Sequence, residues 1–174
     1  MKLTLVDLQS EIVDAWGLHF DGLADVSVMQ GDILEVAENT IVSPANSFGY
    51  MDGGIDRIYI RHFGDRLQLE LHEAIQRRPE GHLPIGASIL VETGDTRVPF
   101  MIAAPTMYMP EPIPAQNCFY AMTAVLMAAD KHSDVVSQVY CPGLGTGVGQ
   151  VSAIGSAREM ADAYRKWSIR KERG

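Results

Sequence analysis

The chain has 174 residues, 47% of which are hydrophobic, and a formal net charge of -8. This length fits one domain with a sizeable core, so we expect a single domain over residues 1–174. No apolar run approaches the roughly 18 residues that a membrane span needs, and acidic residues follow the N-terminus too closely for a secretory signal, so we expect a cytoplasmic protein without a membrane partner. The acidic charge argues against nucleic acid as the main partner. An anionic ligand would therefore be held by backbone amides.

The first half of the sequence alternates predicted strands and helices. Three apolar runs predict strands: 3–6, 25–29 and 40–43. The spacing of apolar residues over 10–20 predicts a helix between the first two strands. From Ile55 to Ile75 an apolar residue recurs every four positions. This spacing predicts one buried helix face, with an interruption at Gly64.

The second half continues the alternation and defines the fold class. It contains predicted strands at 87–93 and 98–104, a helix at 119–129, a strand at 135–141 and a last helix at 154–167. Gly94 and Asp95 predict a tight turn between the first two of these strands, which makes them an antiparallel pair. The order of elements predicts an α/β fold with a mixed, mostly parallel central sheet and helices on both faces. In such sheets, ligands bind outside the carboxyl ends of the strands.

A glycine-rich loop follows the last predicted strand. It carries glycines at positions 143, 145, 147 and 149. Glycines let backbone amides approach a ligand without intervening side chains, and the helix that follows adds its positive end. This composition suits phosphate binding, although on its own it fits a structural turn equally well. It is not a Walker A loop, because no Lys-Ser or Lys-Thr pair follows, and the glycine spacing does not match the dinucleotide fingerprint.

Four segments carry a family resemblance in their order and spacing. They are GDI at 31–33, IVSPANS at 41–47, GGID at 53–56 and PGLGTGVG at 142–149. Together they resemble the macro domain family, whose members bind ADP-ribose, and in particular its bacterial and phage tail-related members. The resemblance implies a three-layer α/β/α sandwich. It also implies ADP-ribose or an ADP-ribosylated substrate as the partner, with no cofactor.

The resemblance implies a role for residues in each segment. Asp32, with Ile33 beside it, would accept a hydrogen bond from the adenine amine; the alternative for Asp32 is a helix N-cap. Asn46 would contact the distal ribose; the alternative is a turn former. Asp56 would orient or activate a water near the distal ribose; the alternative is to stabilise the first turn of a helix. Backbone amides on the two sides of the diphosphate would come from Gly53, Gly54, Ile55, Gly145, Thr146, Gly147 and Val148.

The chain departs from the pattern of the family's hydrolases. Ser43 stands where the family has an asparagine, and Gly149 stands where many hydrolases carry an aromatic residue. Ile60 replaces a helix histidine. The residues that could supply the missing apolar wall are Phe48, Tyr50 and Met51. These departures leave the geometry around the distal ribose open.

Three functions follow, in order of preference. The first is hydrolysis of an ADP-ribosyl linkage in a mono-ADP-ribosylated protein, in O-acetyl-ADP-ribose or in ADP-ribose 1''-phosphate, with Asp56 and Asn46 as catalytic residues. The second is a non-catalytic reader of ADP-ribose. The third is a structural or assembly factor related to phage tail proteins. The spacing of His62, His72 and His82 is poor for a metal site, so we expect no metal.

Overall fold

The computed structural model describes residues 1–173, so the expected domain 1–174 extends one residue beyond them. The strands are β1 (Lys2–Asp7), β2 (Val26–Gln30), β3 (Thr40–Ser43), β4 (Ile89–Glu92), β5 (Phe100–Ala103) and β6 (Gln138–Cys141). They form one six-stranded sheet in the order β2-β1-β6-β3-β5-β4. β4 pairs antiparallel with β5, whereas the other pairs are parallel. The expected mixed, mostly parallel sheet is confirmed.

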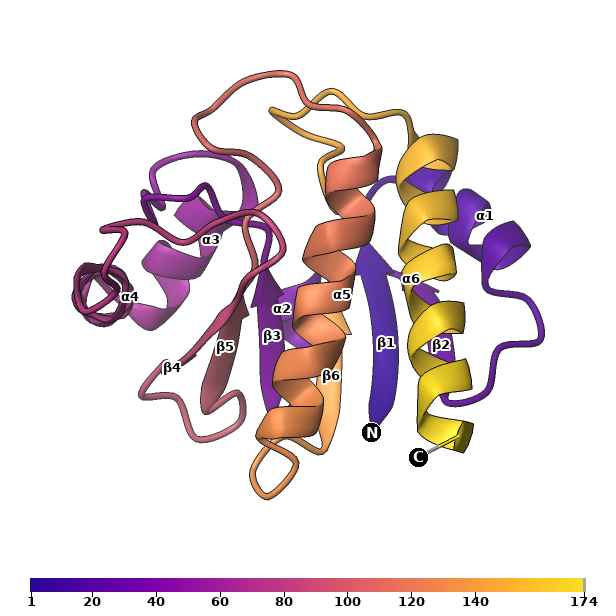
Figure 1. Cartoon of the computed structure of the whole chain (residues 1–174), viewed down its shortest axis with the longest axis horizontal. Helices are drawn as coiled ribbons and strands as arrows, with labels where there is room; N and C mark the ends of the chain where they lie inside the picture. Colours follow the sequence, from indigo (N-terminus) through magenta and orange to yellow (C-terminus); the bar gives the residue numbers. More distant parts are fainter. Residues whose placement is uncertain (174) are drawn as a thin grey trace.

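Helices cover both faces of this sheet. They are α1 (Ser10–His19), α2 (Ile33–Val36), α3 (Gly54–Phe63), α4 (Arg66–Gln76), α5 (Gln116–Lys131) and α6 (Ala153–Arg173). One core packs α1, α5 and α6 against the sheet, and a second core packs α2, α3 and α4 against the opposite face (Figure 1). Neighbouring strand residues alternate between the cores, as Ile41 and Val42 do, because successive side chains of a strand point to opposite faces. The three-layer α/β/α sandwich is confirmed.

Local differences from the sequence prediction have clear causes. The stretch from Ile55 to Ile75 forms two helices, α3 and α4, which meet at Gly64 with φ of 89°. This left-handed conformation favours glycine and ends the first helix. The link between β4 and β5 is longer than the expected tight turn, because both strands are shorter than predicted. The four-residue helix α2 was not predicted; Asp32 caps its N-terminus.

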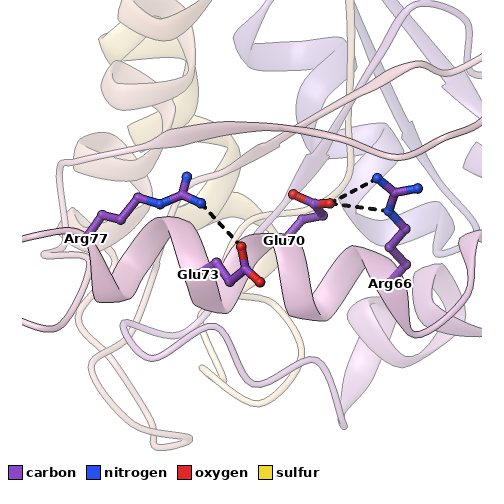
Figure 2. A network of polar contacts seen from close by, with 4 residues as sticks. All are labelled: Arg66, Glu70, Glu73 and Arg77. Carbon is purple, nitrogen blue, oxygen red and sulfur yellow. Dashed lines mark hydrogen bonds and ion pairs between the residues drawn. The ribbon is translucent and has the colours of Figure 1, made fainter.

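Helix α4 has one buried face and one exposed face. Its inner face buries Leu67, Leu71 and Ile75 in the second core. Its outer face carries two ion pairs at i,i+4 spacing, Arg66 with Glu70 and Glu73 with Arg77, each at 3.2 Å (Figure 2). Exposed pairs of this kind stabilise a helix by only about 0.3–0.5 kcal/mol. The buried face therefore determines where α4 lies.

The N-terminal strand occupies the interior of the sheet. β1 pairs with β2 on one side and with β6 on the other, so that Leu5 lies opposite both Val28 and Cys141. β2 is consequently an edge strand, and most of its side chains are at least partly exposed. The loop after β2 and the loop after β6 are separated by the width of β1.

Candidate functional site

A cavity of about 780 Å³ lies at the carboxyl ends of the central strands. Its lining residues come from four segments of the chain, within 7–12, 44–58, 106–110 and 142–153. These segments follow β1, β3, β5 and β6, whose carboxyl ends meet at one edge of the sheet. The volume is in the range of sites that enclose small-molecule ligands. The location agrees with the expectation for an α/β sheet.

The N-termini of several helices contribute to the cavity lining. Glu11 lies in the first turn of α1, Ile55 in the first turn of α3, and Ala153 begins α6. The first amides of a helix have no partner within the helix, and they carry the positive end of its dipole. An acidic protein can therefore hold an anion here with neutral backbone groups.

Asp56 is the most perturbed carboxyl group of the cavity. It lies in the first turn of α3 with only 7% of its surface exposed. The Oγ of Ser43, the last residue of β3, donates a hydrogen bond of 2.6 Å to Asp56 Oδ1. Burial raises the pKa of Asp56 to about 7, and the bond from Ser43 partly opposes this rise. A carboxyl group that titrates near neutral pH is suited to general acid–base chemistry.

Tyr59 holds this part of α3 against the sheet. Its side chain is fully buried, and its hydroxyl donates a 3.0 Å hydrogen bond to the carbonyl of Val42 in β3. Burial and the nearby charge of Asp56 raise the pKa of Tyr59 well above its usual value, so it acts as a neutral donor. Because Tyr59 follows Asp56 by one helical turn, this bond fixes the position of the carboxyl group.

Asn46 lines the cavity, and its side chain also organises its own loop. Its Nδ2 donates to the carbonyl of Tyr50 at 2.8 Å, and its Oδ1 accepts from the amides of Phe48 and Tyr50 at 3.1 and 3.3 Å. The turn-forming alternative is thus realised, whereas contact with a ribose stays a prediction. Of the three apolar candidates, Tyr50 lines the cavity with 49% of its surface exposed, and Met51 is buried.

The glycine-rich loop is held from behind by two helices. The buried carbonyl of Leu144 accepts hydrogen bonds from Cys118 Sγ of α5 at 3.1 Å and from Ser156 Oγ of α6 at 2.7 Å. Gly145 has φ of 71°, and a Cβ there would lie 2.9 Å from Cys118 Sγ. A Cβ at Gly147 would meet none of the described heavy atoms within 4 Å. Gly145 is therefore required for packing, whereas Gly147 borders open space.

The cavity brings together most of the residues predicted from sequence. Those that line it are Asn46, Gly53, Gly54, Ile55, Asp56, Gly145, Thr146, Gly147 and Val148. Asp32 and Ile33 lie elsewhere. Asp32 Oδ1 accepts a 2.9 Å hydrogen bond from the amide of Leu34 and so caps α2, while Ile33 packs in the second core. The structure therefore realises the N-cap alternative for Asp32 through one carboxylate oxygen, whereas contact of Asp32 with adenine stays a prediction.

Sequence reasoning missed the N-terminal contribution to the cavity. Asp7, Leu8, Gln9, Glu11 and Ile12 all line it. Asp7 Oδ2 accepts a 3.1 Å hydrogen bond from the amide of Gly143, and its Oδ1 accepts a 3.0 Å bond from the amide of Gln9. The available signal was the aspartate directly after the apolar run 3–6.

The described residues contain no further clear site for a bound ion. Within 1–173, no group of three or more His, Cys, Asp and Glu side chains could hold a metal. Both cysteines are buried and unpaired with each other, and burial raises the pKa of Cys118 to about 11. Over the same residues, no helix combines the length and apolar character required to cross a bilayer.

Comparison with known proteins assigns the family. The sequence model of the Macro domain matches residues 42–160, which is more than half of the chain. The chain therefore belongs to the macro domain family. The segment that precedes the match contains β1, α1, β2 and α2. The resemblance to phage tail-related members stays a prediction.

Relatives and solved structures agree with this assignment. An uncharacterized protein of Aquifex aeolicus is 36% identical over 144 residues, covering 82% of each chain. One from Aeropyrum pernix is 34% identical over 139 residues, covering 79% of this chain and 69% of its own. The macrodomain of Mycobacterium tuberculosis DarG has a TM-score of 0.67 at 21% identity, covering 78% of this chain and 87% of its own. A variant Oceanobacillus iheyensis macrodomain with ADPR has a TM-score of 0.64 at 19% identity, covering 82% and 87%. These structural matches support the fold.

Proposed function

We propose that this protein binds ADP-ribose and hydrolyses an ADP-ribosyl linkage. One observation carries the proposal: Asp56, with a pKa near 7, lies in a cavity that is also lined by the first turn of α3 and by the glycine-rich loop. Membership of the macro domain family and the ADPR-bound Oceanobacillus structure support the choice of ligand. The diphosphate lies between the amides of Gly53 to Ile55 on one side and those of Gly145 to Val148 on the other.

The proposed reaction uses Asp56 as a general base. The ionised carboxylate takes a proton from a water molecule, and the resulting hydroxide attacks C1'' of the distal ribose. The bond between C1'' and the acceptor oxygen breaks, and the acceptor leaves with the electron pair. For an ester to an acidic side chain, the products are ADP-ribose and the free carboxylate. Ser43 is a positioning residue, because its hydroxyl holds the carboxyl group from behind.

A non-catalytic reader is the second candidate. Asn46 directs both ends of its amide into its own loop, which leaves it fewer bonding groups to hold a ribose in a reactive position. A cavity that holds the diphosphate but leaves the distal ribose loosely held would bind ADP-ribose without turning it over.

Calorimetry and a substrate panel separate these functions. ADP-ribose is titrated into the protein, with AMP and ATP as controls, and we expect ADP-ribose to bind most tightly. Turnover is then measured with glutamate-, aspartate- and serine-linked ADP-ribosylated protein, O-acetyl-ADP-ribose and ADP-ribose 1''-phosphate. Binding without turnover of any of these supports the reader. Equal affinity for the three nucleotides contradicts both functions.

A further inference from the structure

We propose that an exposed aromatic surface beside the cavity binds the polypeptide acceptor of an ADP-ribosylated substrate. This aromatic surface consists of Phe48, Tyr50, His82, Tyr108 and Met109. Its role rests on the proposed function and deepens it, because it specifies the substrate as a peptide with an apolar side chain next to the ADP-ribosylated residue. Its exposure, its fixed conformation and its place beside the reactive end of the cavity support this assignment.

Three side chains of the aromatic surface are open to solvent. Tyr50, Tyr108 and Met109 have 49%, 48% and 44% of their surface exposed. Single exposed apolar residues are common on proteins, whereas a contiguous group of them marks a binding surface. Aromatic and methionine side chains are also enriched where proteins contact each other. The aromatic surface is therefore suited to an apolar partner.

Ring contacts fix the conformation of the aromatic surface. The ring centroid of Phe48 lies 6.3 Å from that of Tyr50 and 5.0 Å from that of Tyr108. The ring of His82 packs against both Phe48 and Tyr108, with centroid distances of 6.2 and 5.5 Å. The amide of Ser47 donates a 3.2 Å hydrogen bond to the carbonyl of Tyr108 and so joins the two loops. Side chains held in this way lose little conformational entropy when a partner binds.

The aromatic surface begins at the reactive end of the cavity. Ser43, which holds Asp56, ends β3, and the loop that carries Tyr108 follows β5. In the sheet, β5 and β6 flank β3 on opposite sides, and the glycine-rich loop of the proposed diphosphate site follows β6. Tyr50 connects the two features, because it lines the cavity and also contacts Phe48. A group joined to C1'' of the distal ribose would therefore leave the cavity toward the aromatic surface.

The extent of the aromatic surface favours a polypeptide over a small acceptor. Tyr108 and Met109 lie outside the cavity lining. An acetyl or phosphate group ends within a few bonds of the ribose, so it would stay inside the cavity. A polypeptide continues on both sides of the modified residue, and a neighbouring side chain can lie on Tyr108 and Met109. Aromatic rings and a thioether favour an apolar side chain at that position over a charged one.

A matched pair of peptides tests this assignment. Both carry ADP-ribose on one glutamine, the amide counterpart of the glutamate ester, so that ester hydrolysis does not disturb the titration. One peptide has leucine on both sides of the modified residue, and the other has serine. We expect calorimetry to show that the wild type binds the leucine peptide about tenfold more tightly than the serine peptide, since a well-packed apolar side chain contributes about that factor.

Two variants locate the preference on the aromatic surface. In Tyr108→Ser and in Met109→Ser, the preference for the leucine peptide should fall to within about threefold, because the apolar contact is lost. The dissociation constant of free ADP-ribose should stay at the wild-type value, because neither residue lines the cavity. The matched control is Leu18→Ser, a residue of α1 with 77% of its surface exposed, which should keep the full preference.

The outcomes separate this inference from the proposed function. If the wild type does not bind free ADP-ribose, the proposed function fails and this inference fails with it. If it binds ADP-ribose but does not distinguish the two peptides, only this inference fails. A preference that persists in folded Tyr108→Ser and Met109→Ser also overturns it. So does a wild-type dimer in sedimentation that becomes a monomer in Tyr108→Ser, because a second copy of the chain would then cover the aromatic surface.

Discussion

The two ends of the cavity differ in how directly the sequence motifs determine them. At the β3 end, motif residues of one continuous segment, from Ser43 to Asp56, lie together as their order predicts. At the β1 end, the motif GDI at 31–33 follows the edge strand β2, and the cavity lining includes Asp7 but not Asp32. Whether a motif that follows a strand lines the cavity therefore depends on the position of that strand in the sheet as well as on the motif itself.

The largest effect is expected at the β3 end. Asp56→Ala should lower turnover by roughly 100-fold or more, because the general base is lost, while ADP-ribose affinity changes little. In the wild type, the rate should rise with pH through about 7 as the carboxyl group ionises. Steady-state kinetics across pH measure both effects. Asp52→Ala is the control, because Asp52 also lines the cavity. If Asp52→Ala removes turnover and Asp56→Ala does not, the assignment of the base is wrong.

The same carboxyl group should make folding stability depend on pH. Burial raises the folded-state pKa of Asp56 from 3.8 to about 7, so between these values the folded state keeps a proton that the unfolded state releases. The stability that this proton contributes is fully present below about pH 4, and it is lost as the pH rises to about 7. Asp56→Asn should therefore gain stability relative to the wild type over this window, by roughly a few kcal/mol. Urea unfolding at pH 5 and pH 8 measures the difference; a constant difference contradicts the prediction.

The glycine-rich loop offers a variant pair that separates ligand contact from packing. Gly147→Val should weaken ADP-ribose binding by roughly tenfold or more at nearly unchanged melting temperature, because its side chain would enter open space beside the proposed phosphate site. Gly145→Val should instead lower the melting temperature, because its Cβ would collide with Cys118 and its φ is positive. Calorimetry and thermal melting are run on both variants. Normal binding by a folded Gly147→Val would remove this loop from the ligand site.

The smallest effect is expected at Asp32, in the motif GDI at 31–33. Asp32→Ala should lower the free energy of unfolding by about 1 kcal/mol, which is typical for loss of a helix N-cap. If Asp32 acts only as an N-cap, ADP-ribose affinity should stay within about twofold of the wild type, because Asp32 is not among the residues that line the cavity. Denaturant unfolding measures the free energy of unfolding, and calorimetry measures the dissociation constant of ADP-ribose. A marked loss of ADP-ribose affinity in a variant of unchanged stability would show that Asp32 contacts the ligand. The motif residues would then form part of the site at both ends of the cavity.

The predictable part of this structure was local in sequence. Strand and helix order, the break at Gly64 and the grouping of Asp56 with the glycine loops follow from periodicity and from short segments. The position of β1 between β2 and β6 could not be predicted in this way, since it depends on which strands pair across more than 100 residues of chain. The role of Ser43 could not be predicted either. The sequence shows only that Ser43 replaces the asparagine of the family pattern, whereas the structure shows the hydrogen bond that Ser43 donates to Asp56.

The hydrogen bonds that hold the carbonyl of Leu144 affect how fast a ligand can bind. Two helices that pack against each other hold this carbonyl through Cys118 and Ser156. A loop fixed in this way has little conformational freedom left to lose, so binding carries a small entropic penalty. Association then requires only encounter and orientation, without a preceding closure of the loop. In stopped-flow binding experiments, the observed rate constant should accordingly rise linearly with ligand concentration. It should reach no plateau, since a plateau would indicate a slow conformational step.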